Sequence, residues 1–413
     1  GRYKLRYSGA VNVKWFGAKD TIIAGNENFD STSSIQLAID TMIGYEVNGA
    51  NGTYKCYSGI NVGAYSILKD MTLDFDNTIT SDYLFFVGDY TNDNPTSYKG
   101  KNIKIENVNI TPSINSENPV RFRNILNCTF RDFNVAARVS GETQTDGYYV
   151  TIDGAVDNLF ERCDFKPQAG YTSPDAPHVQ VLKVGNNMNL AGTANLLNGN
   201  AATSTSFNNC YIHLAESLGI ILGDNITFND CIFEAAIEGF EIVETGSKIT
   251  FNDCYWEAIT RWGVYVRGVD SRAQGTSVKI TGGKVQRNDN NGSVYPFIQM
   301  KNAYSVECTG LVFQGRSQVK LANIETSNTK ESLLLMDYNM SSYTRERQES
   351  IATLTPISII SGETVVTINH VGHTRVLNDL VCLSAVAWLL VQDASQMICD
   401  SLSPCSEGCP GSL

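Results

Sequence analysis

A repeat of twenty-odd residues is the feature that most constrains this chain. The segment FNDCIFEAAIEGFEIV occupies residues 228–243, FNDCYWEAITRWGVYV follows at 251–266, and FNNCYIHLAESLGIIL precedes both at 207–222. The start points are 21 and 23 residues apart. A repeat of this length is typical of solenoids, propellers and other arrays, in which each unit buries its apolar face against its neighbours.

The pattern inside each unit indicates β-strands. Apolar and polar residues alternate with period two, Ile, Val, Phe and Tyr are frequent, and Gly, Asn and Asp interrupt the runs. In FNDCYWE, Cys254 and Trp256 are expected to face the core, and Tyr255 and Glu257 to face outward. With a corner at Gly263, two or three short strands complete a circuit. The repeat therefore predicts an all-β chain folded as a parallel β-helix.

Weaker copies of the unit suggest how the chain is divided. They occupy residues 69–77, 104–110, 124–130, 158–165, 277–286 and 304–313. We expect an N-terminal cap over 1–54, the β-helix over 55–330, a β-rich extension over 331–374 and an atypical tail over 375–413. The stretch from Lys166 to Ser206, rich in Asn, Gly, Ala and Ser, is expected to be a lateral loop.

The eleven cysteines do not read as a disulfide framework. Six of them share one local frame, two residues before a hydrophobic position: Cys128, Cys163, Cys210, Cys231, Cys254 and Cys308. We expect a column of buried free thiols, kept reduced. The last four are Cys382, Cys399, Cys405 and Cys409, and they lack the paired spacing of a metal site. We therefore expect no metal and no cofactor.

Composition excludes several classes of protein. Charged residues are 18% and hydrophobic residues 42%, which fits a folded chain. The net charge of −12 argues against binding to nucleic acid. The longest apolar run, Leu380–Val391, is too short to span a membrane. The sequence starts at Gly1 without a signal peptide, so we expect a processed chain or a fragment.

The N-terminal segment resembles the entry motif of the pectate-lyase-like β-helix superfamily. The matching residues are Val13, Phe16, Gly17, Ala18 and Asp20, then Asp30, Thr32, Ile35, Gln36, Ala38 and Ile39. The motif departs from its usual form at Ser31, where Asp is common. Residues 31–42 are expected to form a capping helix with Asp30 or Ser31 as N-cap and Ile35, Leu37, Ala38 and Ile39 as apolar residues.

With its thiol-bearing coil, the chain resembles the bacteriophage tailspikes and capsular polysaccharide depolymerases of that superfamily. The resemblance implies a right-handed parallel β-helix that forms a homotrimer and cuts bacterial capsular polysaccharide or O-antigen. It also implies a place in the virion tail, assembly in the host cytoplasm, action at the bacterial surface and contact with other tail proteins through a region outside this sequence. No membrane insertion is implied.

Outward-facing residues supply the candidate chemistry. One outward column is expected to contain Lys166, His213, Glu234 and Glu257, and the next Asp164, Tyr211, Ile232 and Tyr255. Two carboxylates about 5 Å apart on adjacent coils repel, so one should hold its proton more tightly. Glycoside hydrolysis needs such a split, and we assign Glu234, Glu257 and Glu238 as candidate catalytic residues. Most outward glutamates of a solenoid, however, are only solvated.

Neighbouring aromatic and basic residues are candidate sugar-binding groups. Aromatic faces stack on sugar rings, and charge-assisted hydrogen bonds hold hydroxyls or carboxylates. This set is His213, Tyr211, Tyr255, Arg261, Trp262, Tyr265 and Arg267. Glu216 and Glu241 are expected to lie outward beyond the same corner, with no role assigned. Weaker candidates are Asp146, Asp153 and His178; Trp256 is expected in the core, and Asp224 and Asp230 at turns.

Two other functions stay open at this stage. A polysaccharide lyase of the same fold needs a base and a cation, for which Lys166, His213 and Arg261 are available. A non-catalytic spike needs only a glycan-binding surface. The sequence does not choose between retaining and inverting hydrolysis, or between a site within one subunit and one between subunits.

Overall fold

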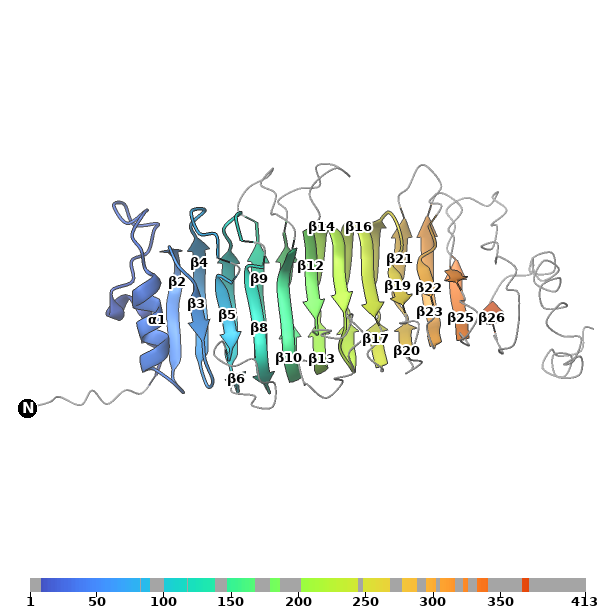
Figure 1. Cartoon of the computed structure of the whole chain (residues 1–413), viewed down its shortest axis with the longest axis horizontal. Helices are drawn as coiled ribbons and strands as arrows, with labels where there is room; N and C mark the ends of the chain where they lie inside the picture. The colour runs from blue at the N-terminus through green and yellow to red at the C-terminus, as the bar shows by residue number, and fades with distance from the viewer. Residues whose placement is uncertain are drawn as a thin grey trace, which may run out of the picture.

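A long coil of parallel strands, closed at one end by a helix, forms the chain (Figure 1). The computed structural model describes residues 9–81, 83–89, 100–116, 118–137, 147–167, 179–185, 202–243, 248–267, 277–287, 295–301, 305–315, 322–325, 333–340 and 366–370. The predicted all-β parallel β-helix is confirmed. No helix in these ranges is long and apolar enough to cross a membrane.

Three faces run along the coil. The first face contains β1 (Val11–Asn12), β13 (Thr203–Asn208), β15 (Ile226–Asn229), β17 (Lys248–Asn252), β20 (Ser277–Thr281), β26 (Val366–His370), the start of β2 (Glu46–Cys56), β4 (Ile67–Phe75), β7 (Lys104–Thr111), β9 (Thr129–Ala136), β23 (Ser305–Gly315) and β25 (Leu333–Met340), and the end of β10 (Gly147–Glu161).

The other two faces follow from later parts of each circuit. The second face contains the ends of β2, β4, β7, β9, β23 and β25, with β11 (Asp164–Lys166), the start of β14 (Tyr211–Ile221) and of β16 (Ile232–Val243), β18 (Tyr255–Ile259) and β21 (Lys284–Arg287). The third face contains β3 (Ile60–Val62), β5 (Phe85–Gly88), β6 (Gly100–Lys101), β8 (Val120–Leu126), the start of β10, β12 (Val179–Val184), the ends of β14 and β16, β19 (Val264–Arg267), β22 (Ile298–Lys301) and β24 (Ala322–Glu325).

Left-handed residues make the corners. Between the first and second faces, Asn209, Asp230 and Asp253 have φ of 52°, 50° and 51°. Asn and Asp adopt this conformation more readily than other side chains, which explains the repeated FNN and FND. The turn predicted at Asp230 is confirmed. A second set of left-handed corners, Leu214, Ala235 and Ala258, follows the second face.

Stacked phenylalanines fill the centre of the coil. The ring centroids of Phe160, Phe207, Phe228 and Phe251 are 4.9, 4.7 and 5.0 Å apart on successive coils. This spacing equals that of hydrogen-bonded strands, so each Phe of the repeat packs on its counterpart. Trp256 is buried beside them, as predicted.

The predicted thiol column is present. Cys163, Cys210, Cys231 and Cys254 each follow a left-handed corner, are buried and are free. Each thiol donates to a carbonyl of the preceding coil, for example Cys231 Sγ to the Phe207 oxygen at 3.3 Å. Burial raises the pKa of Cys231. These cysteines therefore act as small apolar core residues with satisfied donors.

Asparagine amides tie the first corner from coil to coil. Asn229 Nδ2 donates to Asn208 Oδ1 at 2.7 Å, and Asn252 Nδ2 donates to Asn229 Oδ1 at 2.8 Å. Such ladders arise when identical residues stack in register. They explain why the repeat keeps Asn just before each corner.

The cap is built from η1 (Val13–Phe16) and α1 (Thr32–Thr41). Ser31 is the N-cap residue, while the Asp30 carboxylate accepts from the Thr32 amide at 2.9 Å. Ile35, Ala38 and Ile39 are buried against the first coil. The assignment of Leu37 to the apolar face is wrong: its side chain is 54% exposed, because position 37 lies on the far side of the helix.

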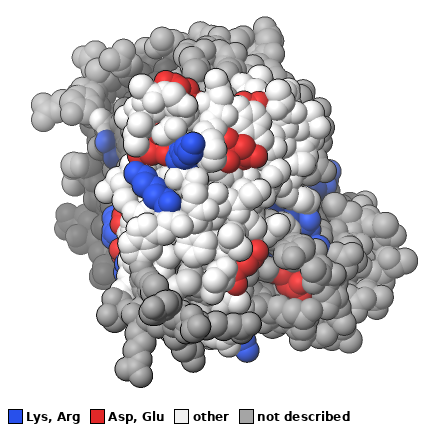
Figure 2. Space-filling view, turned by 90° about the vertical axis from the view of Figure 1, so that its left-hand side faces the viewer, with Lys and Arg blue, Asp and Glu red and all other residues white. Residues whose placement is uncertain are grey.

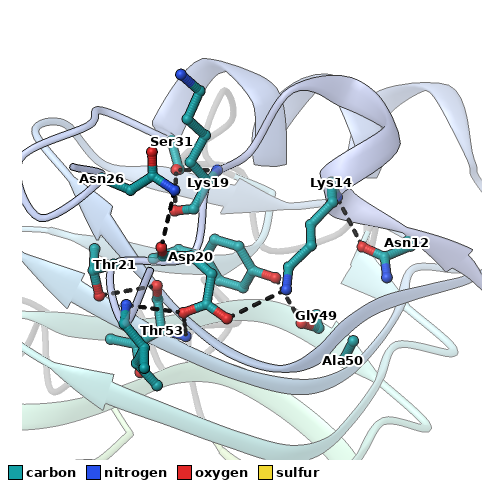
Figure 3. Close-up of polar contacts among 12 residues, drawn as sticks. Asn12, Lys14, Lys19, Asp20, Thr21, Asn26, Ser31, Gly49, Ala50 and Thr53 are labelled. Carbon is teal, nitrogen blue, oxygen red and sulfur yellow. Dashed lines mark hydrogen bonds and ion pairs between the residues drawn. The ribbon is translucent and has the colours of Figure 1, made fainter. Parts of the chain in front are cut away.

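Asp20 of the entry motif locks this cap onto β2 (Figure 3). Its Oδ1 accepts from the amides of Ile22 and Thr53, both at 3.2 Å, and its Oδ2 accepts from Lys14 Nζ at 3.2 Å. Burial raises the pKa of Asp20, but the amide and Lys14 hydrogen bonds outweigh burial and lower it overall. The motif residue thus has a structural role.

The capped end of the coil is poor in charge. Figure 2 shows an end surface that is mostly uncharged, with a few Lys, Arg, Asp and Glu side chains scattered over it. The exposed large apolar side chains of the cap are Trp15, Ile22, Ile23, Leu37, Ile43 and Tyr45.

Two segments differ in detail from expectation. The stretch expected to be one lateral loop contains β12, which pairs with β10 and β14 and completes a coil of the third face. Its alternating VQVLKV is too short to stand out among the polar residues around it. Within the expected extension, β25 and β26 continue the first face. The atypical tail lies outside the described residues.

We expect Asp20→Asn to lower the free energy of unfolding by about 1–2 kcal/mol, because two amides and one ammonium lose a charged acceptor. Lys14→Met, which removes only the ion pair, should cost less. The lowered pKa of Asp20 means that its contribution is full above about pH 4 and is lost as the pH falls further. Urea unfolding at pH 7 and pH 3 measures both effects; an equal deficit at the two pH values would contradict this role.

We also expect the described cysteines to resist alkylation in the native protein. Burial raises the pKa of Cys128 to about 11 and that of Cys56 to about 12, and the thiolate is the reactive form. Iodoacetamide labelling followed by peptide mass spectrometry should modify both only after unfolding in urea. Rapid native labelling of either would show that the coil is open.

Candidate functional site

The second face brings two of the predicted carboxylates side by side. In register, Glu234 of β16 lies between His213 of β14 and Glu257 of β18. Adjacent strands are about 4.8 Å apart. Each of these residues immediately precedes a left-handed corner. The sequence therefore predicted this column correctly, and the corner presents it along one edge of the coil.

Tyrosine hydroxyls hold both carboxylates. Tyr211 donates to Glu234 Oε2, and Tyr255 donates to Glu257 Oε2 at 2.8 Å. Gln286 Nε2 donates to Glu257 Oε1 at 3.2 Å. Burial and the bond to Glu257 raise the pKa of Tyr255 to about 12, and burial and Glu234 raise that of Tyr211 as well. Both phenols remain donors near neutral pH.

His213 is not a free binding group. Its ring lies parallel to that of Tyr211 with centroids 3.6 Å apart, and Nε2 is 2.8 Å from Asp164 Oδ1. Only 6% of the residue is exposed. The outward position was predicted correctly, but alternation gives the side of the strand and not the depth under neighbouring rings. Asp164, which sequence analysis placed in the adjacent column without a role, is its partner.

The remaining predicted acid lies beyond the corner, on the third face. Glu238 Oε1 accepts from Arg261 Nη1 at 2.5 Å, and the Arg261 guanidinium lies 5.8 Å from the ring centroid of Tyr295. Ala235 separates Glu238 from Glu234. The three predicted acids are thus divided into a pair on the second face and a single residue on the third.

Glu241 joins Glu238 on the third face. Its carboxylate forms an ion pair with Arg267, whose Nη2 lies 2.7 Å from Glu241 Oε1. Burial raises the pKa of Glu241; Arg267 opposes this rise, and the nearby charge of Glu238 adds to it. The alternation predicts that Glu241 faces outward, with no role assigned. The run of apolar residues around it, FEIV, was the available signal of burial.

Aromatic rings surround this second pair of acids. The rings of Trp262 and Tyr265 have centroids 5.4 Å apart. Burial and the charge of Glu241 raise the pKa of Tyr148, which places that phenol near Glu241. Tyr148 also packs against an outer apolar cluster formed by Ile220, Leu222 and Val243. The third face thus combines flat apolar rings with two carboxylates in different surroundings.

Of the weaker candidates, only Asp153 lies among the described residues. Asp153 is buried and paired with Arg121, whose Nε and Nη2 lie 2.8 and 2.7 Å from Oδ2; burial raises the pKa of Asp153 despite this partner. Asp146 and His178 lie outside the described residues. Among the described residues, no group of three His, Cys, Asp or Glu side chains is placed to hold a metal ion.

The cations proposed for lyase chemistry are not gathered at one point. β11 pairs with β14, so Lys166 lies beside His213 on the second face. Arg261 lies beyond the corner, bound to Glu238.

Comparison with known proteins shows similarity in structure only. No protein-family model matches the chain, and no curated protein sequence is detectably similar. The tailspike protein of E. coli bacteriophage HK620, solved in complex with pentasaccharide, matches with a TM-score of 0.61 at 13% identity, over 87% of this chain and 65% of that chain. A single-site mutant of the same tailspike, also with pentasaccharide, gives 0.60 at 13% identity, over 88% and 66%. The fold is therefore a tailspike-like parallel β-helix, and the chain spans about two thirds of those tailspike chains.

Proposed function

We propose that this chain is a phage spike that binds a bacterial capsule or O-antigen and cleaves it by glycosidic hydrolysis. The observation that carries the proposal is the pair Glu238 and Glu241 on β16. Both carboxylates are ion-paired, Glu238 with Arg261 and Glu241 with Arg267, and burial raises the pKa of Glu241. A glycosidase needs two neighbouring carboxyl groups, one of which acts as the acid. The tailspike-like fold supports the same conclusion.

Each carboxyl group has a distinct role in this proposal. Glu241, whose pKa is raised by burial, donates a proton to the leaving oxygen, and Glu238, which is paired with Arg261, activates water. The charge of Glu238 acts on Glu241, so the two carboxyl groups lie near one another on the third face. Trp262 and Tyr265 offer stacking surfaces for the sugar rings.

Glu234 and Glu257 are a second candidate pair for the same reaction. Their adjacent positions bring the carboxyl groups closer together, as retaining chemistry needs. Both accept hydrogen bonds from tyrosines. We rank this pair below Glu238 and Glu241 because burial raises the pKa of Glu241, as the acid role requires.

Assembly and location complete the proposal. We propose a homotrimer in the virion tail that meets other tail proteins through parts of the spike outside this sequence. A lyase of the same fold is less favoured, because His213 is buried against Tyr211 and Arg261 lies beyond the corner, bound to Glu238. A spike that binds glycan without cleaving it is the remaining alternative.

We expect Glu241→Gln to reduce the rate of depolymerisation at least 100-fold while glycan binding persists, because general acid catalysis contributes about that much. Glu238→Gln should have a comparable effect. Product mass spectrometry on a panel of purified capsules and O-antigens measures the rate and shows whether water is added. The wild-type rate should fall as the pH rises through the raised pKa of Glu241, because the acid must be protonated.

Glu234→Gln and Glu257→Gln are matched substitutions one face away. If they abolish cleavage while Glu241→Gln does not, catalysis belongs to the second face. Fragments that lack the added water would identify a lyase, and binding without fragments would identify a non-cleaving spike.

We expect glycan binding to change tryptophan fluorescence through Trp262. Trp256 is buried in the core, and Trp15 lies in the cap, so neither should sense a ligand on the third face. The fourth tryptophan, Trp388, lies outside the described residues and is replaced by Phe in both proteins compared. In Trp262→Phe, the change in emission on adding oligosaccharide should disappear. Persistence of the full change in that variant would place the ligand elsewhere.

A further inference from the structure

Lys183 lies in line with the proposed acid. On the third face, register pairs join one residue from each successive strand into a straight column: Arg121, Thr151, Lys183, Ile220, Glu241 and Tyr265. Lys183 and Glu241 are two strands apart, which is about 10 Å between backbones. A glycan lying along the coil would therefore pass both residues.

The other charges of this column are compensated. Arg121 forms an ion pair with Asp153 (Nη2 to Oδ2, 2.7 Å), and Glu241 forms one with Arg267 (Oε1 to Nη2, 2.7 Å). Lys183 has no carboxylate within ion-pair distance among the described residues. Its charge reaches Asp153 and lowers the pKa of that carboxyl, but Asp153 is already bound to Arg121. Within the part of the chain that the structure describes, Lys183 therefore lies between two ion pairs and has no ion-pair partner of its own.

An aromatic ring supports Lys183. Its Nζ lies 5.3 Å from the ring centroid of Tyr148, which holds the ammonium over the ring. The same ring packs against Ile220, Leu222 and Val243, and its phenol lies within reach of the Glu241 charge. Lys183 and Tyr148 are both partly exposed, and they lie over a buried apolar cluster beside the strand that carries the proposed acid.

We propose that Lys183 and Tyr148 form a subsite for an anionic sugar, and that the polysaccharide recognised by this spike is acidic. The ammonium would bind a carboxylate or phosphate substituent, and the ring of Tyr148 would take the flat face of the sugar. The subsite lies two strands from Glu241, so it would bind a sugar of the polymer other than the one at the cleaved bond. This inference rests on the proposed function.

Binding, rather than cleavage, tests the subsite. The probes are purified acidic capsular polysaccharides that contain uronic acid, sialic acid or phosphodiester groups, the uronic and sialic acid polymers also in carboxyl-reduced form, and neutral O-antigens. Affinity electrophoresis with each glycan in the gel gives the dissociation constant at low and at physiological salt. Lys183→Gln removes the charge and Lys183→Arg keeps it, while Lys279→Gln removes a lysine that is paired with Glu307 on the first face.

We expect wild type to bind at least one acidic glycan, and Lys183→Gln to weaken that binding about tenfold, as the loss of one charge-assisted contact implies. Lys183→Arg and Lys279→Gln should bind like wild type. For a carboxylate, reduction of the glycan should weaken binding to wild type and leave Lys183→Gln unaffected; for a phosphate, only phosphodiester glycans should respond. The wild-type advantage over Lys183→Gln should shrink with salt.

Three outcomes would overturn the subsite: binding of neutral glycans alone, equal loss in Lys183→Gln and Lys279→Gln, or no effect of Lys183→Gln on an acidic glycan that binds. Thermal melting of each variant shows whether it is folded. Lys183→Arg, which keeps the positive charge, is the matched control for the loss of charge in Lys183→Gln. Acidic glycan that binds through Lys183 without being cut would refute the hydrolase and leave the subsite standing.

Discussion

In-register stacking of parallel strands is the constraint on which the rest of this molecule depends. Each coil hydrogen-bonds to the next along its whole length, so residues one repeat apart become neighbours about 4.8 Å apart. The left-handed corners at Asn209, Asp230 and Asp253 preserve that register, because each ends a strand at the same place. Phenylalanine stacks, thiol columns and asparagine ladders all follow from this one condition.

The same stacking gives surface residues their chemical environment. The environment of a carboxylate on one coil is set by residues of the adjacent coils as well as by residues of its own strand. Glu257 accepts hydrogen bonds from Gln286 of the next strand and from Tyr255 of its own, and Glu241 is paired with Arg267 of the next coil. Two glutamates of one repeat, Glu234 and Glu241, thus have unlike surroundings although they are only seven residues apart.

Alternation predicted which side of a strand a residue occupies, but not how deeply it lies. Cys254 and Trp256 face the core as expected, and Glu234 and Glu257 are neighbours as expected. The burial of His213 depends on the Tyr211 ring stacked against it and on Asp164 of the preceding coil, which alternation alone does not reveal. β12 was missed because a short alternating segment within a long polar stretch carries too little periodicity to detect.

The straight column on the third face fixes the distances between its residues along the coil axis. Positions along it change only in whole steps of one strand, because a side chain cannot slide against its register partner. A lineage that gained or lost one coil between Lys183 and Glu241 would shift the cation relative to the acid by about 4.8 Å while keeping both local environments. Preference for the spacing of charges along a polymer would then change by discrete jumps, through duplication or deletion of coils.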